Sequence, residues 1–149
     1  MAEKIIIKTK GLMVLFFILL FSSCATTISS FDQQAYIQTT SVKVDALNLM
    51  DSAKEDGYNN HIQAFQALQT NLKKIYEYEK NRPKNEITIK LWDKLLDKNG
   101  HLLGGFLERW KQGTKMSVTF VSNTEEQVEE AFDTISGLES KKIKKADFQ

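Results

Sequence analysis

The chain has one cysteine, one proline and two histidines among its 149 residues. A single cysteine, Cys24, cannot form an intramolecular disulfide, so packing alone must hold the folded domain together. The single proline, Pro83, interrupts helical patterns at only one point. Few structural constraints other than side-chain packing therefore act on this chain.

The sequence also lacks the common catalytic and metal-binding motifs. His61 and His101 are too far apart in sequence for the short spacings typical of zinc and di-iron sites. No Gly-x-Ser-x-Gly nucleophile motif and no phosphate-binding glycine loop is present. We therefore expect no catalytic residue, no metal and no cofactor, and we do not expect an enzyme.

The charge is nearly balanced along most of the chain. Three of the 20 basic residues and one of the 19 acidic residues lie in residues 1–23, which leaves 17 basic against 18 acidic side chains. Binding to nucleic acid needs a basic surface, so we expect no nucleic-acid partner. The last residues are biased, with lysines at positions 141, 142, 144 and 145. They suit a helix C-terminus, or alternatively contact with an anionic lipid or glycan surface.

The N-terminus has the pattern of an export signal. Lys4, Lys8 and Lys10 precede an apolar run over residues 12–21, and Ser22 and Ser23 follow it. A positive segment, a short apolar segment and a small-residue boundary are typical of a signal peptide. Ten apolar residues are too few for a spanning helix, which needs about 20.

The segment Phe21-Ser22-Ser23-Cys24 resembles the lipobox of bacterial lipoproteins, with Phe21 in place of the usual leucine. The resemblance implies cleavage before Cys24, diacylglycerol on its thiol and acylation of the new amine. Several acyl chains give stable membrane attachment, whereas one gives weak attachment. Ordinary secretion and an uncleaved anchor are the alternatives. The implied organisation is a signal peptide over 1–23, a lipidated cysteine and tether over 24–30, and a helical domain over 31–149.

The position after the cysteine bears on location. An aspartate there tends to retain Gram-negative lipoproteins in the inner membrane, and this chain has Ala25. The resemblance thus implies a lipid anchor in the cell envelope, at the outer membrane and facing the periplasm if the host is Gram-negative.

Apolar residues recur at steps of three and four along most of residues 31–149, which predicts helices. The expected helices cover about 30–56, 58–81, 85–97 with Asn85 as N-cap, and 117–145, with a short helix or irregular segment at 101–113. We expect an all-α antiparallel helical bundle of three long helices plus one or two short ones. Six residues should be buried in its core: Phe65, Leu72, Leu95, Val128, Phe132 and Ile135.

The start of the last helix has two interpretations. Thr124 and Gln127 have the spacing of a capping box, which would leave Met116–Val121 extended. Ser117 is the other N-cap candidate, and we favour it because a lone strand has no partner strand.

Two features between residues 76 and 110 suggest function. Gly104-Gly105 predicts close backbone packing, or alternatively a groove beside it. Both tryptophans and both arginines also lie here, and such residues are enriched at binding hot spots and equally common in small cores. The possible interaction surface consists of Tyr78, Arg82, Trp92, Arg109 and Trp110. A site built from Tyr78, Glu86 and Arg109 is a further alternative.

The part after Cys24, with its segments 42–50 and 82–86, resembles uncharacterised small helical lipoproteins, and that resemblance implies no functional residue. The expected function is a non-enzymatic binding or structural module, attached to the bilayer through acylated Cys24 and docking to a protein partner. The alternatives are an accessory to an enzyme of envelope polymers and an exclusion-type lipoprotein of a mobile element.

Lipidation of Cys24 can be tested directly. Metabolic labelling with a fatty-acid analogue should mark the wild-type protein and leave Cys24→Ser unmarked, because only the cysteine thiol accepts diacylglycerol. Equal labelling of both proteins would refute the lipobox assignment.

Overall fold

The computed structural model describes residues 29–140, which form helices joined by short turns and contain no strand. The expected all-helical class is confirmed for these residues. The signal segment, Cys24, most of the tether and the lysines at 141–145 lie outside the described residues.

The first half of the described chain forms α2 (Gln33–Ser52), a 3-10 turn η1 (Tyr58–Asn60) and α3 (Ile62–Lys80). Asp32 caps α2, where its carboxylate accepts the Ala35 N–H at 2.9 Å. We expected one helix from 58 to 81, and that was wrong at its start. The backbone leaves helical geometry at His61, and the Tyr58 ring packs against Phe65 at a centroid distance of 4.9 Å.

The second half forms α4 (Glu86–Leu96), α5 (Leu103–Lys111) and α6 (Val118–Glu139). Asn85 is the residue before α4, as expected, but its side chain makes no capping hydrogen bond there. Ser117 caps α6 by accepting the Phe120 N–H at 3.1 Å, which confirms the favoured start. The capping box at Thr124 was wrong, because Thr124 is inside α6 and donates to the Phe120 carbonyl.

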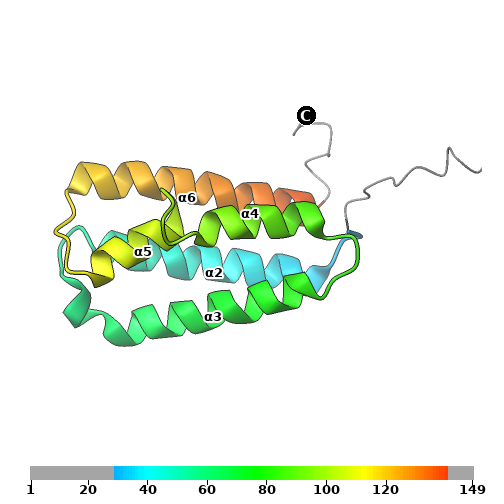
Figure 1. Ribbon diagram of the computed structural model, residues 1–149, viewed down its shortest axis with the longest axis horizontal. Helices are drawn as coiled ribbons and strands as arrows, with labels where there is room; N and C mark the ends of the chain where they lie inside the picture. The colour runs from blue at the N-terminus through cyan, green and yellow to red at the C-terminus, as the bar shows by residue number, and fades with distance from the viewer. Residues whose placement is uncertain (1–28, 141–149) are drawn as a thin grey trace, which may run out of the picture.

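The helices lie lengthwise beside one another (Figure 1). α2 packs most extensively on α6 and next on α3, while α4 packs on α3, α5 and α6. The short helices α4 and α5 follow one another along the body and together occupy the position of a fourth long helix (Figure 1). The body therefore has two ends, one at the start of α2 and one at the start of α6.

The core runs along the whole length between these helices. All six residues expected to be buried are buried, with Phe132 fully so. Trp92 packs edge-on against Phe132, with ring centroids 5.8 Å apart. Such a contact joins α4 to α6 and adds to the apolar burial that stabilises the domain.

The break between α4 and α5 depends on the glycine pair. A Cβ atom on Gly104 would lie 2.3 Å from the Leu96 carbonyl oxygen, and one on Gly105 would lie 2.0 Å from the Gly100 carbonyl oxygen. Both distances are far below van der Waals contact. The close backbone packing expected from Gly104-Gly105 is confirmed, because the 97–102 linker folds directly onto the first turn of α5.

Gly104→Ala should therefore destabilise the protein by about 1–3 kcal/mol, since the clash is with backbone that cannot move aside. Glycine to alanine inside a helix is otherwise stabilising by up to about 1 kcal/mol. Gly57→Ala is the matched control, because no atom lies within 4 Å of its would-be Cβ. Urea denaturation measures both variants, and a Gly104→Ala protein as stable as wild type would contradict the packing described.

Candidate functional site

The five residues expected as one interaction surface do not form one. Trp92 and Trp110 are 0% and 2% exposed and belong to the core. The side chain of Arg82 is 7% exposed and engaged by carboxylates. This correction has a simple physical reason. Aromatic side chains fill cores as readily as they form binding surfaces, and an arginine is buried where carboxylates pair with it, as they do with Arg82.

The remaining two candidates lie at opposite ends of the body. Tyr78 donates a hydrogen bond to Asp32 at the start of α2. Arg109 lies over the ring of Phe120, at the other end, with its guanidinium carbon 5.9 Å from the ring centroid. A site that combines Tyr78 with Arg109 and Glu86 is therefore also wrong.

Arg82, in the turn after α3, is the centre of a buried ion cluster. Its Nη1 atom lies 2.8 Å from Oε2 of Glu79 and 2.8 Å from Oε2 of Glu139. The first contact is a hydrogen bond, while the second is an ion pair without hydrogen-bond geometry. Both carboxylates are almost fully buried. One guanidinium thus connects the last turn of α3 to the last turn of α6.

The same arginine also holds the chain just before α2. Its Nη2 atom donates to the Ser29 hydroxyl and to the Ser30 carbonyl, both at 3.0 Å, and its Nε atom lies 3.6 Å from Asp32. The entry of the chain into the helical body is therefore fixed to the ends of two helices.

Asn85 completes the cluster from the start of α4. Its buried amide donates to the Glu79 carbonyl at 2.9 Å and also to the Glu79 carboxylate. Within residues 29–140, Oε1 of Glu79 and Oδ1 of Asn85 find no hydrogen-bond partner. Unpartnered buried acceptors are costly, so the cluster holds its carboxylates in an unfavourable setting.

The pKa values of two carboxyl groups at this end, those of Glu139 and Asp32, are shifted in opposite directions. Burial and the neighbouring Glu79 carboxylate, against the opposing charge of Arg82, together raise the pKa of Glu139 to about 7. The hydrogen bond from the Ala35 N–H lowers the pKa of Asp32, and Tyr78 and Arg82 act in the same direction.

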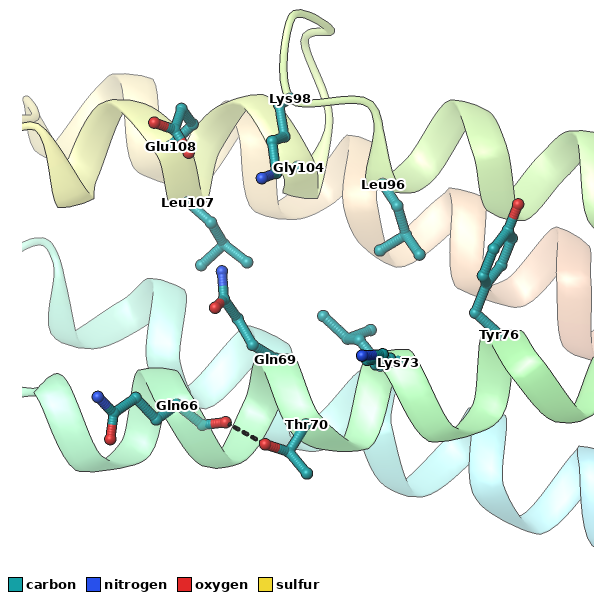
Figure 2. Close-up of a pocket in the computed structure, with 11 residues that line it drawn as sticks. Gln66, Gln69, Thr70, Lys73, Tyr76, Leu96, Lys98, Gly104, Leu107 and Glu108 are labelled. Carbon is teal, nitrogen blue, oxygen red and sulfur yellow. Dashed lines mark hydrogen bonds between the residues drawn. The ribbon is translucent and has the colours of Figure 1, made fainter.

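A groove with a volume of about 680 Å³ lies between α3 and the α4–α5 segment. Leu72, Leu96 and Leu107 form its apolar part, and Gln66, Gln69, Thr70 and Lys73 line the α3 side. Figure 2 shows Gln69 pointing from α3 towards the gap, with Lys98 and Glu108 on the opposite side. Gly104 also lines this groove, so the groove that was the alternative for the glycine pair is present as well.

A second groove of about 700 Å³ lies on the other side of the α4–α5 linker, against α6. His101, Lys94, Gln127 and Glu130 are among its lining residues. His61, by contrast, lies beside Trp110, with ring centroids 5.5 Å apart and ring planes tilted by 34°. The two histidines therefore occupy separate environments.

Sequence reasoning missed Glu79 and Glu139, although a signal was present, and gave Asn85 only the role of an N-cap. Glu79 follows Ile75 at four residues, and Glu139 follows Ile135 at the same spacing. Each glutamate thus continues an apolar helical stripe into the last turn. A carboxylate on a core-facing position predicts burial, and hence a charged partner.

Between residues 29 and 140, no helix is long and apolar enough to cross a membrane. In this same part of the chain, no group of three or more His, Cys, Asp or Glu side chains is placed to hold a metal ion. Comparison with known proteins finds no matching family model, no similar curated protein and no similar solved structure.

The raised pKa of Glu139 predicts a pH dependence of stability. The folded protein binds this proton more tightly than the unfolded chain, so the free energy of unfolding should fall as pH rises from 4.5 to about 7. Glu139→Gln, which cannot ionise, should remove this part of the dependence and exceed wild-type stability at about pH 8.

Urea denaturation between about pH 5 and pH 8 measures this effect, in a range where the Asp32 carboxyl stays ionised. Glu126→Gln, an exposed glutamate on the same helix, is the control and should follow wild type. A Glu139→Gln protein with the wild-type pH profile would show that Glu139 does not carry the effect.

Proposed function

We propose that this protein is a lipid-anchored lipoprotein of the cell envelope that acts as a non-enzymatic binding module for a protein partner. Acylated Cys24 holds it at the bilayer, at the outer membrane and facing the periplasm if the host is Gram-negative. The helical body is an antiparallel bundle whose fourth member is divided into α4 and α5. The observation that carries the binding role is the groove beside this division.

The groove has the chemistry of a site for an extended polypeptide segment. Its α3 wall presents the side chains of Gln66, Gln69 and Thr70 at helical spacing on one face. Primary amides both donate and accept hydrogen bonds, so they match the backbone N–H and C=O groups of a bound segment. The leucines beneath supply apolar contact, and the volume is within the range of about 300–1,000 Å³ typical of binding pockets.

The charged residues along the groove favour one orientation of a bound segment. Lys73 and Lys98 contribute cations and Glu108 contributes one carboxylate, so the lining has a net positive charge. A partner segment with an acidic side chain opposite the lysines would fit these charges best. No contact or cavity within residues 29–140 favours the role of enzyme accessory or of mobile-element exclusion over this function.

Site-specific photo-crosslinking in the host cells tests the proposal. A photo-reactive amino acid at Gln69 should give one protease-sensitive adduct of defined mass, because this side chain points into the groove (Figure 2). The same replacement at Gln127, an exposed glutamine that lines the second groove, is the matched control and should give none.

Thr70→Trp places a large side chain in the first groove and should abolish the Gln69 adduct. An adduct at Gln127 alone, no adduct at either position, or a Gln69 adduct that Thr70→Trp leaves unchanged would each contradict a partner site in this groove.

A further inference from the structure

The end of the body where α2 begins carries two exposed aromatic side chains. We call this the tether end and define it as Phe31, Tyr78 and the turn 81–85. Phe31 is 50% exposed and Tyr78 is 37% exposed. Both lie at this end of the body, because Tyr78 donates a 2.7 Å hydrogen bond to Asp32, the residue next to Phe31. Pro83 and Lys84 are exposed in the adjoining turn.

The ion cluster fixes where the chain leaves this end. Arg82 binds both Ser29 and Ser30, so the described chain starts at a defined point beside Phe31. Ser29 lies five positions after Cys24, and a fully extended chain of that length spans at most about 18 Å. The opposite end is farther away by the length of α6, which is about 33 Å for 22 residues. An anchor on Cys24 therefore keeps the tether end near the bilayer, whereas the tether alone does not hold the other end there.

We propose that the tether end is a second membrane contact, in which Phe31 enters the interface of a phospholipid bilayer with Tyr78 beside it. Aromatic side chains favour this interfacial region. One acyl-anchored residue and one apolar contact on a rigid body together define an orientation, with the start of α6 pointing away from the membrane. This inference rests on the proposed lipid anchor at Cys24.

Tryptophan scanning with the lipidated full-length protein tests the contact. The variants Phe31→Trp, Val44→Trp and Val118→Trp place a reporter at the tether end, at the middle of α2 and at the start of α6. The three native side chains are matched in exposure, at 50%, 55% and 58%. Trp92 and Trp110 are buried, so their emission is a constant background that the wild-type protein measures.

Each variant is reconstituted into vesicles of phosphatidylglycerol and phosphatidylcholine with brominated acyl chains, which quench tryptophan on contact. The emission introduced by Phe31→Trp should be mostly lost, and that from Val44→Trp and Val118→Trp should be retained.

The results that would contradict this membrane contact differ from the result that would refute the lipid anchor. Equal quenching of all three variants would mean that the body lies flat on the bilayer. A blue-shifted Phe31→Trp emission that bromine does not quench would place Phe31 against protein, such as a second copy of the chain. Either result overturns the inference while vesicle flotation still shows anchoring. Wild-type protein that fails to float with vesicles would instead refute the lipid anchor of the proposed function.

Discussion

The contact between the glycine pair of α5 and the linker that follows α4 is the constraint on which the rest of this structure depends. Backbone carbonyls of Leu96 and Gly100 occupy the space where side chains at 104 and 105 would be. Because the linker folds onto α5, the fourth member of the body is divided into two short helices (Figure 1). The groove along α3 lies at this division and includes Gly104 in its lining. The absence of side chains at 104 and 105 thus allows the backbone packing beside which the groove of the proposed binding role lies.

Arg82 has a structural role that differs from that of the glycine pair, and it acts at the tether end. Burying one cation with two carboxylates has a large desolvation cost, which the mutual attraction only partly offsets. Such clusters are therefore weak sources of stability, and their value is geometric. Here the guanidinium joins the ends of α3 and α6 to the residues that precede α2. It fixes the direction in which a membrane tether would leave a body that otherwise consists of smoothly packed helices.

The proposed anchor and the proposed binding groove use separate parts of the molecule. The tether end carries exposed aromatic residues and the entry point of the chain, whereas the groove runs along the side of α3. A protein that stands on its tether end would leave this side groove open to the surrounding solution. Attachment and recognition could then change independently, since few residues take part in both.

The sequence by itself determined the elements that depend on local or periodic signals. Apolar spacing located α2, α3, α4 and α6, and it left the segment of α5 as either a short helix or irregular. Six core residues were identified correctly and Ser117 was recognised as an N-cap, because each signal acts within a few turns of one helix. Glycine at 104 and 105 likewise indicated close packing. Tertiary structure decided what depends on residues distant in the chain. Arg82 meets Glu139 only because α3 and α6 end at the same place, and the tryptophans became core rather than surface because neighbouring helices cover them.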